Sequence, residues 1–232
     1  MSSRRAQPQM TRLEQIRGFL FFALFFLVFP SLKTLAEWFF DHFFGLYLSE
    51  ALSAMVYYYL IGILTWFLFR RFLKQDLRLL LDFLPENLSS CAVGLAGALA
   101  LQFLVNRLPY PVENPTPASW AEQYAYSPAA TAIIGGILMP LIEEVLFRGL
   151  VFGSLRGYSP LAAWLVSMLL FMVYSVWTFA VAHEDVRYLV LAVQYLPLAA
   201  ALALCYERGG CVCSCVLLHA LLNALALFQA VH

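Results

Sequence analysis

Charged residues are scarce in this 232-residue chain. Asp, Glu, Lys and Arg together make up 12% of the sequence, whereas hydrophobic residues make up 62% and aromatic residues 16%. A soluble domain of this length has too little interior to hide that much apolar surface. The composition therefore excludes an ordinary soluble domain and indicates a protein that lies in a membrane.

An excess of charge of either sign is also lacking. Fourteen basic and fourteen acidic residues give a formal net charge of zero, so the overall charge does not point to a nucleic-acid partner. Internal repeats and low-complexity tracts are lacking as well, and Asn114 is no glycosylation acceptor because Pro115 follows it. We therefore expect a single membrane domain whose partners include the lipid bilayer and no nucleic acid.

Long apolar runs are what the chain has in abundance. A helix needs about 20 apolar residues in a row to cross a bilayer. The first run has basic residues before it and no convincing small-residue cleavage site after it, so we expect an anchor helix and not a signal peptide. The pattern predicts an all-α, polytopic membrane bundle of about seven transmembrane helices, at residues 18–35, 49–69, 89–105, 127–152, 160–182, 188–206 and 211–230.

Basic residues fall mostly on one side of these spans. Four arginines precede the first span, three arginines and a lysine follow the second, and one arginine follows each of the fourth and the sixth. The opposite set of loops holds Lys33, Arg107 and Arg187. Basic residues concentrate in cytoplasmic loops, so we expect a cytoplasmic N-terminus and an external C-terminus.

The chain divides into three expected parts. Residues 1–17 form a basic cytoplasmic segment, residues 18–126 form transmembrane scaffold helices with an external loop, and residues 127–232 form the core. Repeated prolines between Asn106 and Ser127 are expected to prevent regular structure in that loop. Two interpretations of residues 70–86 stay open, an amphipathic helix on the membrane surface and a solvated connector. The aromatic residues of the first two spans, including Tyr57, Tyr58 and Tyr59, are interpreted as scaffold.

Three cysteines, Cys211, Cys213 and Cys215, alternate at the start of the last span. Metal sites in proteins usually combine two closely spaced pairs of ligands, and Cys91 and Cys205 do not supply a second pair cleanly. We interpret the cysteines as small packing residues in a reducing compartment.

Two adjacent glutamates and an arginine interrupt the fourth apolar run, at Glu143, Glu144 and Arg148. An ionised side chain near the middle of a bilayer costs at least about 2.5–3.5 kcal/mol, so the three together indicate a functional site. Glu144 and Arg148 are four residues apart and can pair on one helix face. Glu143 is rotated by about 100° from Glu144 and needs a partner elsewhere. The alternative is an ion pair that only holds this helix to a neighbour.

The last apolar run supplies polar residues at a matching depth. His219 and Asn223 are four residues apart and therefore share one helix face. At a rise of about 1.5 Å per residue, His219 and Glu143 both fall near the middle of the bilayer. We therefore expect Glu143 to meet His219 where the two helices adjoin.

This combination of motifs resembles the CAAX-protease and bacteriocin-processing family (CPBP or Abi) of intramembrane endopeptidases. The resemblance rests on Glu143-Glu144-x-x-x-Arg148 and on His219-x-x-x-Asn223, and it covers residues 127–230. It implies that Glu143 activates a water that attacks a peptide bond, while His219 and Asn223 stabilise the oxyanion. It also implies a peptide or protein substrate in or at the membrane, of the kind that includes prenylated peptides, and a place in a bacterial plasma membrane.

The middle motif of that family, Phe-x-x-x-His, is altered here. Phe171 is in place, but Ser175 stands where a histidine that helps to hold the water is expected. Residues 179–183 fit the motif letter by letter, yet helical rise puts His183 about 12 Å further along than Ser175, so we align Ser175 with the motif.

Dependence on a metal stays open, because members of the family are described both as metalloproteases and as metal-free enzymes. A catalytic zinc site needs three protein ligands. Without the middle histidine, Glu143 and His219 are the main candidates, and zinc is less expected here than in a member with all motifs.

Two other functions are weighed against the endopeptidase. The missing histidine supports a pseudoprotease that binds without cutting and acts as a bacteriocin-immunity or membrane assembly factor. A transporter has less support, because the sequence has neither inverted repeats nor paired helices broken by glycine or proline. We expect an intramembrane endopeptidase, with the pseudoprotease as the alternative.

Overall fold

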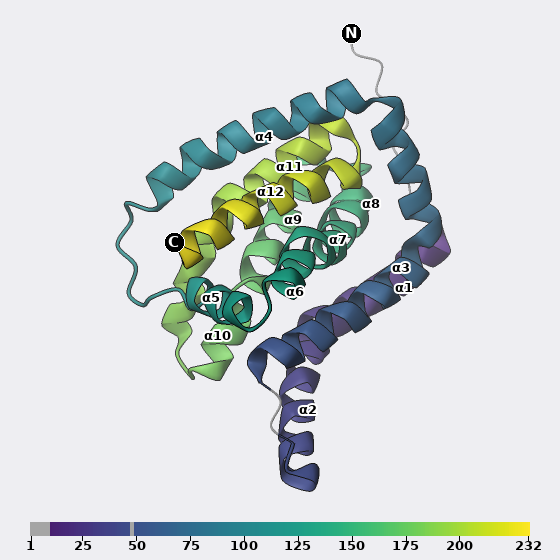
Figure 1. Ribbon diagram of the computed structural model, residues 1–232. Helices are drawn as coiled ribbons and strands as arrows, with labels where there is room; N and C mark the ends of the chain where they lie inside the picture. Colours follow the sequence, from purple (N-terminus) through teal and green to yellow (C-terminus); the bar gives the residue numbers. More distant parts are fainter. Residues whose placement is uncertain (1–9, 47–48) are drawn as a thin grey trace.

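The computed structural model describes residues 10–46 and 49–232, so most of the expected basic segment 1–17 lies outside the described residues. Within the described part, every regular element is a helix (Figure 1). This confirms the expected all-α bundle of seven transmembrane helices. The helices that are long and apolar enough to cross a membrane are Arg12–Phe44, Ala51–Asp82, Leu84–Val105, Pro128–Arg156, Pro160–Ala182, Val186–Gly209 and Val212–Val231.

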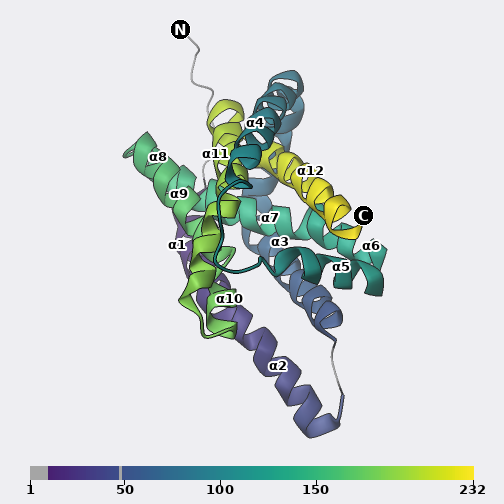
Figure 2. The ribbon, with the colours of Figure 1, turned by 90° about the vertical axis from the view of Figure 1, so that its left-hand side faces the viewer.

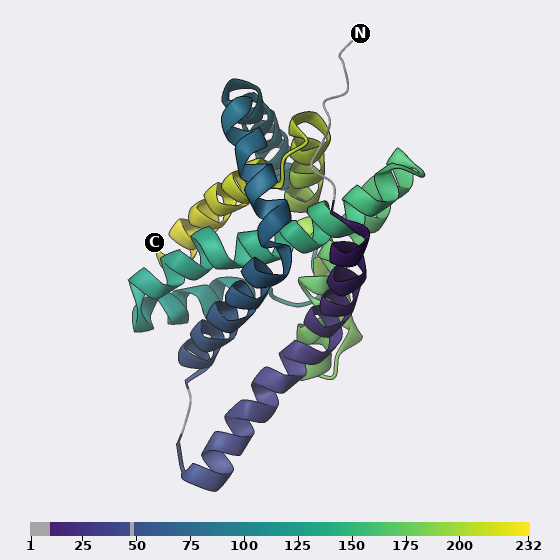
Figure 3. The ribbon, with the colours of Figure 1, turned by 90° about the vertical axis from the view of Figure 1, so that its right-hand side faces the viewer.

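The first span begins with one face against the bundle and then leads away from it. Its first part, α1 (Arg12–Ala23), starts at a capping box in which the Thr11 hydroxyl accepts the backbone N–H of Glu14 and the Glu14 carboxylate accepts the N–H of Thr11. A π-helical turn then leads into α2 (Phe29–Phe44), which has no buried residue. Figure 3 shows α2 extending away from the other helices. We infer that α2 packs mainly against lipid.

The second span is one long helix, α3 (Glu50–Asp82), and α4 (Leu84–Val105) follows almost at once. Residues 70–82 therefore continue α3, and the interpretation of this segment as a solvated connector is wrong. Its apolar residues recur at helical spacing, and Phe72, Leu73 and Leu80 are buried. The first proline after this run is Pro85, which lies in the first turn of α4, where proline is tolerated.

Asp76, near the end of α3, caps the helix that carries His219. It is buried, and its Oδ1 accepts the N–H of Val212 at 2.9 Å while its Oδ2 accepts the N–H of Cys213 at 2.6 Å. These are the first N–H groups of α12 (Val212–Val231), which have no partner within the helix. A carboxylate there satisfies them and complements the helix dipole. Asp76 thus fixes the start of α12 against α3.

The proline-rich segment contains a helix, α5 (Thr116–Tyr126), so the expectation of irregular structure throughout is wrong. Pro115 directly precedes this helix and Pro117 lies in its first turn, where the missing N–H of proline breaks no helical bond. Trp120 of α5 packs so closely over Gly135 that a Cβ at this glycine would lie 2.4 Å from the indole ring. The segment therefore covers the beginning of the fourth span.

The fourth span, which carries the charged motif, alternates between α- and π-helix. It comprises α6 (Pro128–Ile133), η2 (Ile134–Leu138), α7 (Met139–Glu144), η3 (Val145–Phe152) and α8 (Gly153–Arg156). Every residue of η3 is buried. π-Helical turns are rare and often mark functional sites. The remaining elements are α9 (Pro160–Tyr174), α10 (Trp177–Ala182), η4 (Val186–Tyr195) and α11 (Leu196–Gly209). The α7–η3 segment packs against α3, α9, α11 and α12, and so runs through the centre of the bundle (Figure 2).

Candidate active site

A buried cluster of ionisable side chains joins the fourth span to the last. It contains Glu143 and Glu144 at the end of α7, Arg148 in η3 and His219 in the middle of α12, all of them buried. Removing charged side chains from water is costly unless they are paired. The contacts within the cluster therefore show which side chains are already paired and which remain available to a substrate or a water.

Arg148 and Glu144 form the ion pair that their spacing indicates. Arg148 Nη1 donates to Glu144 Oε1 at 3.2 Å, and Nε lies 3.2 Å from Oε2. Nη2 of the same guanidinium donates to the carbonyl oxygen of Ala199 in α11 at 3.2 Å. The guanidinium carbon also lies 4.6 Å from the centre of the Phe171 ring in α9, within cation–π range. Arg148 thus connects three helices and holds Glu144 in place.

His219 lies between the two glutamates. Its Nδ1 is 2.9 Å from Glu144 Oε1, a hydrogen-bond distance, and its Nε2 is 3.9 Å from Glu143 Oε2. An N–H at Nδ1 satisfies the contact with Glu144, because a carboxylate paired with Arg148 accepts hydrogen bonds. This contact turns Nε2 toward Glu143. The carboxylate nearest to His219 is therefore that of Glu144, whereas the sequence led us to expect that of Glu143.

Glu143 is the less constrained of the two carboxylates. Among the described residues no side chain or backbone group donates a hydrogen bond to it, and its one ion-pair contact is the 3.9 Å approach of His219. Its side chain is 7% exposed, whereas that of Glu144 is fully covered. A small molecule that reaches the cluster would therefore meet Glu143 first.

Asn223 follows His219 by one turn of α12 and also contacts the fourth span. Its Nδ2 donates to the carbonyl oxygen of Gly135 in η2 at 2.9 Å and lies 3.9 Å from the sulfur of Met139. A side-chain amide has a second N–H and an acceptor oxygen besides. Asn223 thus joins α12 to η2 and α7, and the second acceptor of its amide N–H groups is the weakly accepting sulfur of Met139.

Ser175 and His183 are the two residues considered for the middle motif. Among the contacts of the described residues, neither one bonds to the charged cluster. Ser175 follows α9, and its hydroxyl donates to the carbonyl oxygen of Phe171 at 2.9 Å, within its own helical turn. His183 lies after α10, is exposed and stacks on Tyr188 at 4.5 Å between ring centres. The aligned Phe171 is in contact, since its ring lies 5.9 Å from that of His219.

Tyrosines that we had interpreted as scaffold, or had not singled out, lie near Glu143. Two of them belong to the run of three tyrosines at residues 57–59. No polar pattern around this run distinguishes a packing face from a functional one. The tyrosines whose hydroxyls interact electrostatically with the Glu143 carboxylate are Tyr57, Tyr58, Tyr174 and Tyr195.

The cluster does not fit a tight zinc site, which needs three protein ligands. Nε2 of His219 and the Glu143 carboxylate face each other, but Nδ1 and Glu144 are bonded together, and the Ser175 hydroxyl is bonded to its own helix. In the described ranges, the three potential ligands whose donor atoms lie within 4.8 Å of one another are Asp76, Cys211 and Cys213. They lie at the start of α12, two turns before His219, where Asp76 already caps the helix.

Comparison with known proteins agrees with this geometry. Residues 125–225 match the family model described as type II CAAX prenyl endopeptidase Rce1-like, and that segment contains the whole charged cluster together with Phe171 and Asn223. A search of curated proteins and a search of solved structures each found no match. The match over residues 125–225 to the type II CAAX prenyl endopeptidase Rce1-like model confirms the resemblance inferred from the two motifs.

Proposed function

We propose that the protein is an intramembrane endopeptidase in which Glu143 activates the attacking water. One observation carries this proposal, the unequal pairing of two adjacent buried carboxylates. Glu144 is bound by both Arg148 and His219, whereas Glu143 keeps its carboxylate available. A general base must be able to reach the proton that it removes. Glu143 meets that requirement and Glu144 does not.

The proposed reaction divides the work between Glu143 and His219. Glu143 takes a proton from water, and the water oxygen forms a bond to the peptide carbonyl carbon. The hydrogen bond between Nδ1 of His219 and Glu144 keeps Nε2 directed at the same space, so protonated His219 can donate from Nε2 to the developing oxyanion. As the C–N bond breaks, Glu143 passes its proton to the leaving amine. Glu144 and Arg148 orient His219 and do not touch the substrate.

Asn223 is proposed as a second oxyanion donor. One N–H of its amide is bound to Gly135 and fixes the amide plane one turn after His219 on α12, and the Met139 sulfur is a weak acceptor that a substrate oxygen can replace. Loss of one oxyanion donor typically costs about 10²–10³-fold in rate.

We propose that the reaction proceeds without zinc. The support is the donor set, since Glu143 and His219 face each other without a third ligand among the described residues. Removal of divalent metal by a chelator is then expected to leave cleavage unchanged.

The proposed substrates are peptides or proteins in or at the membrane, including prenylated ones, because the site lies within seven membrane-spanning helices and matches a CAAX endopeptidase family. We propose a bacterial plasma membrane as the location, with the N-terminus in the cytoplasm, since the loop arginines divide so unevenly. A reporter fused after His232 that is active only in the cytoplasm would contradict this orientation.

The second candidate function is a pseudoprotease that serves as an immunity or assembly factor. Ser175 favours it, because its hydroxyl is bonded to Phe171 and replaces a histidine. Cleavage of a membrane-anchored peptide library by the purified protein, with and without a chelator, separates the two functions. Cleavage in both conditions supports the metal-free endopeptidase. Binding without cleavage supports the pseudoprotease.

A further inference from the structure

We propose that the hydroxyls of Tyr57 and Tyr174 hold the water that Glu143 activates, and so replace the histidine that is missing at position 175. This inference rests on the proposed function and adds two residues to its site. Ser175 itself does not donate a hydrogen bond to that water, because its single hydroxyl proton is donated to the Phe171 carbonyl.

Tyr174 is fixed on the side of the bundle where Glu143 lies. It ends α9, one turn after Phe171, whose ring contacts both Arg148 and His219. The Tyr174 ring lies 5.6 Å from that of Phe147, which follows Glu143 by four residues, and Phe25 of the first span stacks on it at 4.7 Å. Rings held on two sides have few rotamers left, so the hydroxyl has a defined position.

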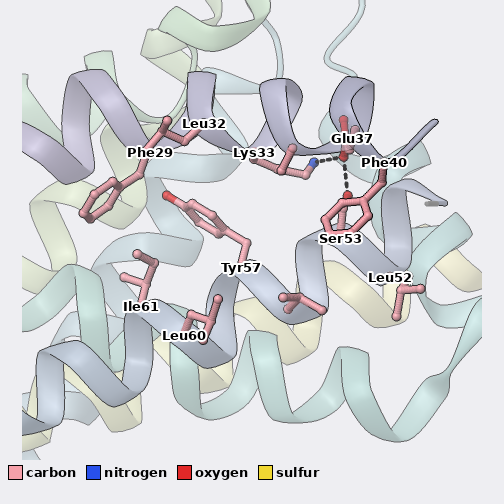
Figure 4. Close-up of a pocket in the computed structure, with 12 residues that line it drawn as sticks. Phe29, Leu32, Lys33, Glu37, Phe40, Leu52, Ser53, Tyr57, Leu60 and Ile61 are labelled. Carbon is pink, nitrogen blue, oxygen red and sulfur yellow. Dashed lines mark hydrogen bonds and ion pairs between the residues drawn. The ribbon is translucent and has the colours of Figure 1, made fainter. Parts of the chain in front are cut away.

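Tyr57 reaches the same place from α3. It lines a cavity of about 420 Å³ between α2 and α3 whose wall is almost wholly apolar (Figure 4). Figure 4 shows the Tyr57 hydroxyl directed toward the Phe29 end of this cavity, away from the contact between Glu37 and Ser53. Phe29 lies one turn beyond Phe25, which stacks on Tyr174. The phenol therefore points toward the Tyr174 side of the bundle.

The hydroxyl of Tyr57 is buried without a hydrogen bond of regular geometry among the described residues. The polar groups with which it interacts are the Tyr174 hydroxyl and the Glu143 carboxylate. Buried hydroxyls in native proteins nearly always have a partner, which can be an ordered water. A water with about three polar partners is a stable arrangement, and two phenols with one carboxylate supply that number.

The other two tyrosines near Glu143 fit this role less well. The Tyr195 hydroxyl is already bonded to Thr116 Oγ1 at 2.7 Å, which ties η4 to the first residue of α5. Tyr58 also interacts electrostatically with Glu143 and with Tyr174, but among the described residues its hydroxyl is not one of the buried groups left without a hydrogen-bond partner, whereas that of Tyr57 is. The hydroxyls of Tyr57 and Tyr174 interact with each other as well as with Glu143.

The chemistry needs no added charge. A water between the phenols and Glu143 donates one proton to the carboxylate and accepts hydrogen bonds from the tyrosine hydroxyls. When Glu143 removes the proton, these hydroxyls remain as donors to the oxygen that attacks the carbonyl carbon. Phenols suit this task in a membrane because their rings pack against apolar residues while the hydroxyl stays available.

The test compares Tyr57→Phe, Tyr174→Phe and the double variant with Tyr59→Phe. Tyr59 follows Tyr57 by two residues on the same helix and is 40% exposed. Its replacement therefore controls for the loss of a hydroxyl from α3. Cleavage of a membrane-anchored peptide is expected to fall by about 10²-fold in kcat for each single variant, with KM nearly unchanged. Because both hydroxyls hold one water, the double variant should lose little more than either single variant.

Binding of a peptidyl phosphinate gives a second readout, because one phosphinate oxygen takes the place of the attacking water. The Tyr57→Phe and Tyr174→Phe proteins should bind it at least about tenfold more weakly than Tyr59→Phe, a difference that corresponds to one lost hydrogen bond. Thermal unfolding in detergent shows whether each variant is folded, and if one is not, the other carries the test.

The outcomes separate this inference from the proposed function. If the native protein cleaves and both phenylalanine variants cleave as fast as Tyr59→Phe, the tyrosine pair is overturned and the endopeptidase stands. If the native protein binds the phosphinate through the tyrosines but does not cleave, the endopeptidase fails and the tyrosine pair stands. A native protein that neither cleaves nor binds the phosphinate overturns both.

Discussion

Nδ1 of His219 lies 2.9 Å from Glu144 Oε1, and this contact fixes the direction of the whole imidazole ring. Nε2 then faces Glu143, while Arg148 holds Glu144 from its other side. The adjacent glutamates therefore have different surroundings although they share one helix turn. We propose on this basis that Glu144 positions His219 and that Glu143 acts on the water.

Arg148→Ala should destabilise the protein strongly. It leaves Glu144 buried without its cation and removes the bond to the Ala199 carbonyl, and breaking a buried pair in this way typically costs about 3–5 kcal/mol. A lower unfolding temperature in detergent and a lower yield are expected. Arg107→Ala is the matched control, because Arg107 is exposed and lies over the Phe103 ring. Equal stability of the two variants would contradict the role of Arg148.

Asp76→Ala should weaken the start of α12. Loss of a helix cap costs about 0.5–2 kcal/mol, and here two N–H groups lose their acceptor. Asp82→Ala, at the exposed end of the same helix, removes a carboxylate that caps nothing among the described contacts. Thermal unfolding should distinguish the variants, and an Asp76→Ala protein as stable as Asp82→Ala would show that this cap contributes nothing.

Gly135→Ala should disturb the end of the site near Asn223. An added Cβ would lie 2.4 Å from the Trp120 ring, and overpacking of this kind typically costs about 1–3 kcal/mol. Gly136→Ala is an internal control, since a Cβ there meets no atom within 4 Å. We expect lower stability for the first variant only. Replacing Trp120 by leucine in the Gly135→Ala protein should restore stability, and a failure of this rescue would assign the loss to another contact.

Sequence patterns predicted the parts of this structure that are local or imposed by the membrane. Seven apolar runs became seven membrane-crossing helices, because backbone groups in lipid must be satisfied within the helix. The pairing of Glu144 with Arg148 follows from a spacing of four residues. The approach of His219 to Glu143 was predicted from depth alone, which gives the level of each residue but not its nearest carboxylate.

Features that depend on distant packing could not be predicted in this way. Asp76 caps a helix that begins 136 residues later, and nothing near Asp76 in the sequence indicates it. Helix α5 was missed because prolines in a first turn look like prolines that prevent a helix. Tyr57 and Tyr174 were missed because only the arrangement of α3 and α9 around α7 brings their hydroxyls near Glu143.

Ser175→Ala and His183→Ala should both leave turnover within about twofold of the native value, since neither removes a group that acts on the water or the oxyanion. The Ser175 hydroxyl is bonded within its own helix turn, and His183 stacks on Tyr188 at the surface. Initial rates of peptide cleavage measure this directly. A loss of about 10²-fold in Ser175→Ala would show that the serine itself holds the water. The same loss in His183→Ala would show that the middle motif lies at residues 179–183.

The most direct test of the account is the rate of peptide cleavage by Glu143→Gln, with Glu122→Gln as the control. Glu122 lies exposed on α5, so its change removes one carboxylate of equal size that is not part of the buried cluster. Loss of the general base should lower kcat by at least about 10²–10⁴-fold, while the unfolding temperature of Glu143→Gln stays close to that of the control. A Glu143→Gln protein that is folded and cleaves as fast as Glu122→Gln would contradict the assignment of Glu143 as the base.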